Sequence, residues 1–120
     1  MEKADYNIAS VTKALQLIDL LSRKNGQLSV QALAEKLDVS PSNVTRLLQT
    51  MRDAGFVEKS PKTNRYLLSN KFYVVTSNML YSNECIQKYL PVAQRVAAKL
   101  NATVALNSLY GKNAVMLARA

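Results

Sequence analysis

Six polar side chains follow one another at helical spacing between residues 42 and 50 of this 120-residue chain. They are Ser42, Asn43, Thr45, Arg46, Gln49 and Thr50. Asn and Gln can bond adenine through two atoms, Arg can bond guanine or phosphate, and Ser and Thr adapt to several partners. A purely solvated helix face would more often carry pairs of Glu and Lys. The pattern therefore favours a groove-contacting helix over a merely solvated one.

An apolar stripe on the other side of the same segment would seat this helix on a core. Its members fall at i, i+3, i+4 and i+7: Val44, Leu47, Leu48 and Met51. Ser40 and Pro41 are typical of a helix start, because the Ser hydroxyl accepts a backbone N–H and Pro suits the first helical position. Gly55 stands where a left-handed residue would end the helix. These signals predict a helix over residues 41–54.

After this helix the periodicity changes from helix to strand. Residues 56–59 and 65–68 predict two short strands, and residues 60–64 supply turn formers. Lys62 and Arg65 would lie in or near the turn, either contacting phosphate or protecting the ribbon edge from aggregation. A helix followed directly by a ribbon with a basic tip indicates a winged helix.

The positive charge is unevenly distributed. Lys and Arg number 16 against 8 Asp and Glu, which gives a formal net charge of +8. Residues 1–39 hold five basic and five acidic side chains, residues 40–71 hold six and two, and residues 72–120 hold five and one. Such an excess predicts a polyanionic partner. Within the N-terminal half, it falls on the predicted helix and wing.

The composition excludes several kinds of chemistry. The chain has no His, so a His-containing zinc site or a His-based catalytic pair is not available, and the single Cys85 excludes an intrachain disulfide. Carboxylates are few and scattered, and no glycine-rich phosphate loop appears. We therefore expect no enzyme activity, no cofactor and no metal. No apolar run reaches transmembrane length and the N-terminus lacks a signal peptide's apolar core, so a soluble, cytoplasmic protein is expected.

The first predicted helix has an unusually broad apolar face. Ser10 is its expected N-cap, and Asn25-Gly26 would end it. Its main stripe is Val11, Ala14, Leu15, Ile18 and Leu21. Leu17 and Leu20 widen this stripe, either because the helix is deeply buried in its own domain or because they also face a second subunit. We favour a homodimer, since bacterial DNA readers usually bind as two-fold dimers, and a higher homo-oligomer stays open.

A second helix completes a helix-turn-helix. Ser29 would cap it, and Val39 would be the buried residue of the turn that leads into Ser40. Just before it, Gln27-Leu28 would add a short strand against the wing. In the wing, Tyr66 is expected to be a core residue.

With these elements in place, the sequence resembles the N-terminal domain of IclR-type transcriptional regulators. The resemblance lies in SVTKALQLIDLLS, LSVQALAEKLDVSPSNVTRLLQTMRDAGFVEK and RYLLS, and it covers residues 10–69. The family pattern L-A-x-x-x-G-L-x-x-S-T-x-x-R-L-L-x-x-L-x-x-x-G-[FY]-[VL] is matched by Leu33, Ala34, Val39, Ser42, Arg46, Leu47, Leu48, Met51, Gly55, Phe56 and Val57. Three positions depart from it. Asp38 replaces the glycine of the turn, Asn43 replaces a common threonine, and Ser69 replaces a glycine that often follows the second wing strand.

The resemblance implies a sequence-specific regulator of the repressor type that binds double-stranded DNA. Arg46, Asn43 and Gln49 would read bases. The remaining expected contacts are to the DNA backbone, from Ser42, Thr45, Thr50, Lys62 and Arg65. The alternative is a winged helix that binds protein or oligomerises and does not bind DNA.

The C-terminal half predicts further helices and a hairpin. In the family, a helix over residues 70–83 links the DNA-binding domain 1–69 to an effector domain, of which 84–120 would be the beginning. Within the helix that Asn83 and Glu84 open, Pro91 predicts a kink or a restart.

Residues 102–109 and 114–118 are β-rich runs around a turn signal at 110–113. The expected fold is thus mainly α with a small β wing and a C-terminal hairpin. Because two strands are too few for a sheet with a ligand pocket, the chain is expected to be truncated. A small-molecule effector would then bind only a full-length form.

Overall fold

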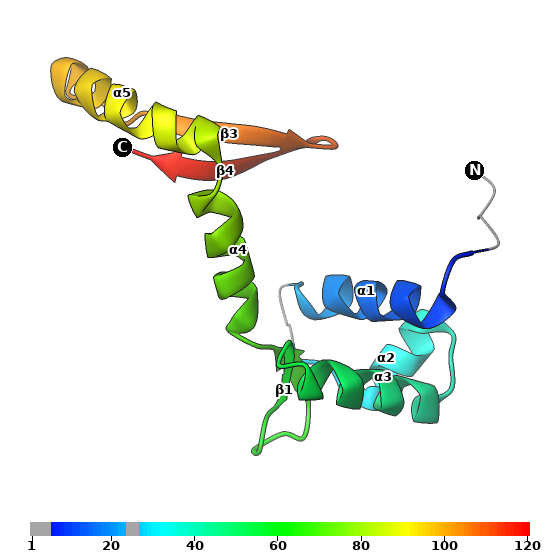
Figure 1. Ribbon diagram of the computed structural model, residues 1–120. Helices are drawn as coiled ribbons and strands as arrows, with labels where there is room; N and C mark the ends of the chain where they lie inside the picture. The colour runs from blue at the N-terminus through cyan, green and yellow to red at the C-terminus, as the bar shows by residue number, and fades with distance from the viewer. Residues whose placement is uncertain (1–5, 24–26) are drawn as a thin grey trace. The chain divides into compact units, whose positions relative to one another are not determined.

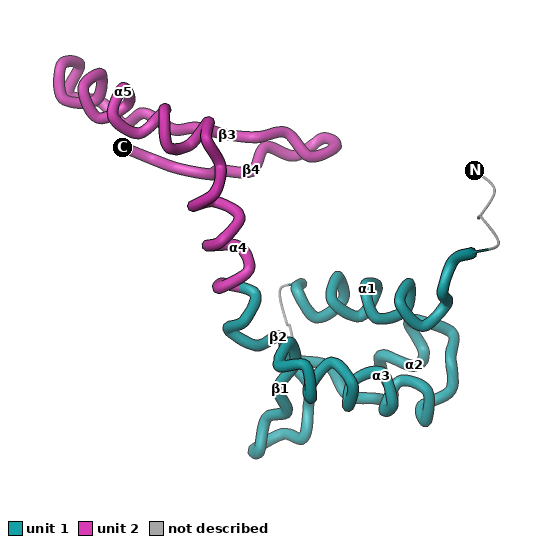
Figure 2. The backbone as a smooth tube through the Cα atoms, in the orientation of Figure 1, with its two compact units in different colours: residues 1–72 teal, residues 73–120 magenta. Residues whose placement is uncertain are grey.

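The computed structural model describes residues 6–23 and 27–120. The chain divides into two compact units, residues 1–72 and 73–120 (Figure 2). Figure 1 shows the elements, which are α1 (Ala9–Leu21), α2 (Val30–Leu37), α3 (Pro41–Asp53), β1 (Val57–Lys59), β2 (Tyr66–Leu68), α4 (Lys71–Tyr81), α5 (Glu84–Leu100), β3 (Ala105–Tyr110) and β4 (Asn113–Arg119). The predicted winged helix-turn-helix, the following helices and the C-terminal hairpin are confirmed. The domain boundaries expected at 69/70 and 83/84 stay predictions.

One hydrophobic core holds the first unit together. Its buried members come from α1, α2, α3 and the wing: Leu17, Leu21, Leu33, Ala34, Leu37, Val44, Leu48, Met51, Val57 and Tyr66. The stripe predicted for α3 is confirmed, because Val44 and Leu48 are fully buried and Leu47 packs at the edge of the core. This core fixes which side of α3 faces outward.

The rotation of α1 differs from the prediction. Leu17 is fully buried, so it cannot face a second subunit, and its burial within its own domain is confirmed. Leu20 is half-buried against the same core, and its contact with a second subunit stays a prediction. Val11 and Leu15, expected in the main stripe, are instead 52% and 59% exposed. Apolar residues cover so much of the circumference of this helix that the hydrophobic pattern does not define which side faces the core.

The ends of α1 also differ from the prediction. Its N-cap is Ile8 and not Ser10, and no side chain within the described part of the chain caps it. The helix ends at Leu21, with Ser22 as its C-cap. The predicted ending pair, Asn25-Gly26, lies outside the described residues.

The turn between α2 and α3 accommodates Asp38, which stands where the family pattern has glycine. The Ser29 side chain accepts the Ala32 N–H at 3.2 Å, which confirms the predicted cap of α2. Asp38 ends the helix with φ +53° and ψ +49°, a left-handed conformation that Asp tolerates better than most residues. Val39, predicted to be the buried residue of the turn, packs against the core but is only half-buried.

The wing pairs as predicted. β1 and β2 are antiparallel, with Val57 opposite Leu68 and Lys59 opposite Tyr66. Leu28 forms an isolated bridge with Tyr66, with N···O distances of 3.2 and 3.0 Å, so the expected strand contact before α2 is confirmed. Tyr66 is 5% exposed and belongs to the wing core.

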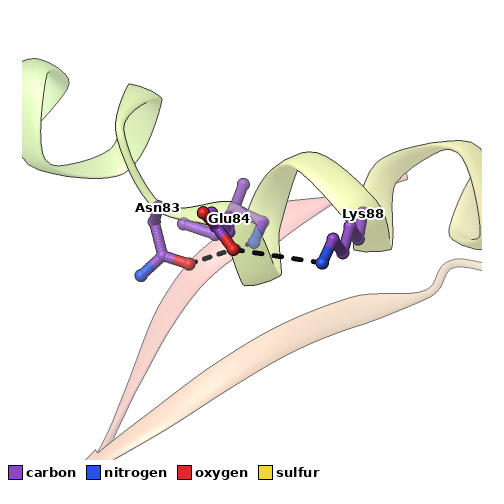
Figure 3. A network of polar contacts seen from close by, with 4 residues as sticks. Asn83, Glu84 and Lys88 are labelled. Atoms are coloured by element: carbon purple, nitrogen blue, oxygen red, sulfur yellow. Dashed lines mark hydrogen bonds and ion pairs between the residues drawn. The ribbon is translucent and has the colours of Figure 1, made fainter.

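The second unit is built from α4, α5 and the β3–β4 hairpin. At the start of α5 the Asn83 side chain accepts the Ile86 N–H at 3.1 Å, while Lys88 and Glu84 form an exposed ion pair at 3.9 Å that adds little stability (Figure 3). The helix continues uninterrupted past Pro91, so the predicted restart is wrong.

Leu109 pairs with Ala114 and Tyr110 with Asn113 across the tight turn of the hairpin. Gly111 in this turn has φ +58°. Within the described residues, every helix is too short or too polar to span a membrane.

Replacing Asp38 with Gly should stabilise the protein by up to about 1 kcal/mol, because Gly adopts a left-handed φ without the strain that a side chain adds. Chemical denaturation followed by circular dichroism measures the change. The matched control is Glu35→Gly, within α2, which should destabilise by about 1 kcal/mol. A loss of stability in Asp38→Gly would contradict the strain assigned to this turn.

Candidate nucleic-acid interface

Both ends of α3 are closed by local hydrogen bonds. At the start, Ser40 Oγ accepts the Asn43 N–H at 3.3 Å and Pro41 occupies the first turn, as predicted. At the end, Gly55 has φ +88° and donates its N–H to Arg52 O, while Phe56 donates to Met51 O, both at 2.9 Å. This pair of bonds is the Schellman motif, which satisfies carbonyls that a helix end leaves free.

Residues that follow the wing reinforce the end of α3. Lys71 Nζ donates to Ala54 O at 3.2 Å, and Ser69 Oγ donates to Gly55 O. Ser69 Oγ also accepts the Lys71 N–H at 3.2 Å. Ser69, which stands where the family pattern often has glycine, therefore joins the recognition helix to the start of α4. Sequence reasoning missed this contact, because nothing in the local pattern pairs residues 55 and 69.

All eight residues predicted to contact DNA are exposed. Six lie on α3 and two on the wing: Ser42, Asn43, Thr45, Arg46, Gln49, Thr50, Lys62 and Arg65. On α3 they form two columns at i, i+3 and i+7. One column, formed by Asn43, Arg46 and Thr50, borders a groove of about 550 Å³ between α1 and α3. Val11 and Leu47 line the same groove. The surface is thus accessible; its contacts with DNA stay a prediction.

Two of the hydroxyl groups already have partners inside the helix. Thr45 Oγ1 donates to Pro41 O at 2.9 Å, and Thr50 Oγ1 donates to Arg46 O at 2.8 Å. A hydroxyl has one proton to donate, and phosphate oxygens only accept. Either threonine must therefore rotate away from its backbone carbonyl before it can bind a phosphate.

Asp53 is the one carboxylate on α3, and it holds Gln49 rather than Arg46. Gln49 Nε2 donates to Asp53 Oδ1 at 3.0 Å. Among the described residues the ion pair between Lys88 and Glu84 is the only one, so Arg46 and Asp53 do not form an ion pair. The exposed guanidinium of Arg46 thus has no ion-pair partner within residues 6–23 and 27–120.

The wing loop has a defined conformation that presents its basic residues. Ser60 donates its N–H to Arg65 O at 2.8 Å and accepts from the Asn64 N–H at 2.9 Å. Asn64 takes a left-handed φ of +56°. Thr63 Oγ1 donates to Gln27 Oε1 at 3.3 Å, which joins the loop to the segment before α2. Backbone bonding therefore closes the loop without using any charged side chain.

Comparisons with known proteins agree with this geometry. Residues 10–61 match the model of the IclR helix-turn-helix domain. The chain is 25% identical over 101 residues to the transcriptional repressor IclR of Escherichia coli, covering 84% of this chain and 37% of that protein. It is 25% identical over 99 residues to the acetate operon repressor of Salmonella typhimurium, covering 82% and 36%.

Solved structures of IclR regulators also resemble this chain. An IclR transcriptional regulator from Alicyclobacillus acidocaldarius superposes with a TM-score of 0.73 at 26% identity, over 96% of this chain and 47% of that one. An IclR family regulator from Brucella abortus gives 0.83 at 19% identity, over 100% and 46%, and supports the fold. The chain spans less than half the length of each of these four proteins.

Replacing Asp53 with Asn should tighten non-specific binding to duplex DNA about two- to fivefold at low salt, because it removes the negative charge from α3. The Asn oxygen can still accept the Gln49 amide proton. Fluorescence anisotropy with a labelled duplex at two salt concentrations measures the effect, which should shrink as salt rises. Glu84→Gln makes the same change of charge outside this surface and should leave binding unchanged. An equal gain in both variants would contradict a local role.

Proposed function

Because residues 10–61 match the IclR helix-turn-helix domain, we propose that this chain is an IclR-type transcriptional regulator, which binds a specific operator in double-stranded DNA and represses transcription by occupying it. The observation that carries the proposal is the exposed polar side of α3. This side is fixed in direction by the buried stripe of Val44 and Leu48, and it lies on a helix closed at both ends. The charge of residues 40–71, six basic against two acidic side chains, suits a phosphate backbone.

In the proposed complex α3 enters the major groove, whose width of about 12 Å admits a helix. Arg46, Asn43 and Gln49 contact base edges. The exposed guanidinium of Arg46 is suited to guanine, while Asp53 orients the Gln49 amide. Ser42, Thr45 and Thr50 bind the adjacent backbone, the two threonines after their hydroxyls rotate. Lys62 and Arg65 on the wing bind phosphates outside the groove.

Repression by this route needs no catalysis, since a bound protein blocks access to the DNA beneath it. Both curated relatives named above are themselves called repressors. We further propose that the chain acts as a homodimer in the cytoplasm. Two α3 helices would read two half-sites about 34 Å apart, which is the usual spacing for helix-turn-helix dimers.

Replacing Arg46 with Ala should weaken operator binding by about 1–3 kcal/mol and relax the base preference at one position, because a bidentate base contact is lost. The operator is first obtained by selecting bound duplexes from a random pool, and affinities are then measured on the selected site and on single-base variants. Arg52→Ala, on the same helix and also exposed, is the matched control and should leave base preference intact. Unchanged affinity in Arg46→Ala would remove α3 from the proposed role.

Replacing Lys62 with Ala should lower the slope of log affinity against log salt by about 0.9, because one phosphate contact and its released counterion are lost. The loss should be the same for operator and random duplexes. Binding isotherms at several salt concentrations give the slope. Lys36→Ala, on α2 and also exposed, removes the same charge outside the proposed surface and should leave the slope unchanged. Equal slopes for Lys62→Ala and the unaltered chain would show that the wing does not contact the backbone.

A further inference from the structure

α1 and α3 pack side by side in the first unit (Figure 1), and the groove between them has an apolar floor. Its apolar lining consists of Ala9, Val11, Ala14, Val39, Leu47 and Met51. Met51 is buried in the core, and Ala14, Val39 and Leu47 pack against it. The volume of about 550 Å³ falls within the range of small-molecule sites, which is about 300–1,000 Å³. The groove is therefore a preformed hollow of a size that a small molecule fills, and not merely the exposed side of one helix.

The charge at this groove is positive. Among the described residues that line it, Lys13 and Arg46 are the charged ones. Lys13 Nζ donates to Leu37 O at 3.1 Å, which leaves two of its three N–H bonds for other acceptors. Arg46 has no ion-pair partner within residues 6–23 and 27–120, and Asn43 supplies an amide in the same groove. The lining therefore favours an anion above the apolar floor.

A smaller hollow between α1 and α2 does not combine these features. Its volume is about 270 Å³, and Asp19 places a carboxylate among its basic residues. Its apolar lining in the described part of the chain is limited to Leu20 and Leu37. An anion with an apolar body therefore fits the groove between α1 and α3 better than this second hollow.

Three residues that line the groove also belong to the surface proposed to contact DNA. They are Asn43, Arg46 and Thr50. A protein segment packed permanently over them would exclude the duplex, so the occupant of the groove has to leave when DNA binds. A second copy of the chain is also a poor occupant, because its net charge of +8 opposes two basic side chains. A small anion that exchanges with solution, and whose body is apolar, satisfies both conditions.

We infer that the groove between α1 and α3 binds a small carboxylic acid with an apolar ring or chain. The apolar body lies on Val11, Ala14 and Leu47, and the carboxylate accepts two parallel N–H bonds from the Arg46 guanidinium. The site lies within the first unit. It is therefore separate from the effector domain, of which residues 84–120 are expected to be the beginning.

A bound acid occupies the guanidinium that the proposed function assigns to guanine. The acid and the operator therefore exclude one another, and each lowers the apparent affinity of the chain for the other. DNA binding by the first unit then responds directly to a small molecule. This competition and the choice of an exchangeable occupant rest on the proposed function, whereas the shape and the charge of the groove do not.

Binding is tested on the whole chain with naphthoate, a flat apolar carboxylate, and with naphthylmethanol, its neutral analogue. Two-dimensional amide NMR spectra locate each probe and give its affinity. Naphthoate should shift the signals of residues that line the groove. It should bind at least about tenfold more tightly than naphthylmethanol, because only the carboxylate gains charge-assisted hydrogen bonds. Equal affinities for the two probes overturn the inference, and so do signals that shift across α4 and the β3–β4 hairpin instead of the groove.

Two matched pairs of variants test the parts of the site. Val11→Glu places a carboxylate in the groove and should weaken naphthoate binding at least about tenfold, because like charges then meet. Leu15→Glu makes the same change of charge on α1 outside the lining of the groove and should leave the affinity unchanged. Both positions are more than half exposed, so thermal unfolding should change little in either variant. Arg46→Ala should also lose at least about tenfold in affinity, whereas Arg52→Ala should lose none. Equal affinities within either pair overturn the site.

Competition with DNA is measured separately, by fluorescence anisotropy of a labelled operator duplex at rising naphthoate concentration. The unaltered chain and Leu15→Glu should release the duplex at the same naphthoate concentration, and Val11→Glu should need at least about tenfold more. A duplex that stays bound while NMR shows the groove filled overturns the competition. A chain that binds the operator but not naphthoate overturns the inference and leaves the proposed function intact. A chain that binds naphthoate in the groove but no DNA contradicts the proposed function and leaves the binding site intact.

Discussion

The burial of one narrow apolar stripe on α3 is the constraint on which the rest of the first unit depends. Val44 and Leu48 are fully buried, and each residue of a helix is turned by about 100° from the last. Rotating α3 by one residue would therefore carry Arg46 toward the core, where an unpaired charge is very costly. The stripe thus sets the direction of every polar side chain on the helix. The bonds at its two ends set where the helix begins and stops.

The contrast between α3 and α1 shows what sequence alone can establish. On α3, the apolar residues occupy one side only, so periodicity predicts its rotation, and Ser40, Pro41 and Gly55 predict its ends. On α1, apolar residues lie on most sides, and tertiary contacts decide that Leu17 is buried while Leu15 is exposed. The hydrophobic pattern of α1 predicts that a helix forms and leaves its rotation undetermined. The wing and the C-terminal hairpin were predictable because strand period and turn formers are local signals.

The contacts that could not be predicted join residues distant in sequence or depend on side-chain rotation. Ser69 reaches the carbonyl of Gly55 only because the wing returns the chain to the end of α3. Thr45 and Thr50 turn their hydroxyls inward to backbone carbonyls, which a list of polar residues cannot show. Sequence therefore predicts which side of α3 is polar and exposed, whereas the donors that are free on that side are known only from the structure.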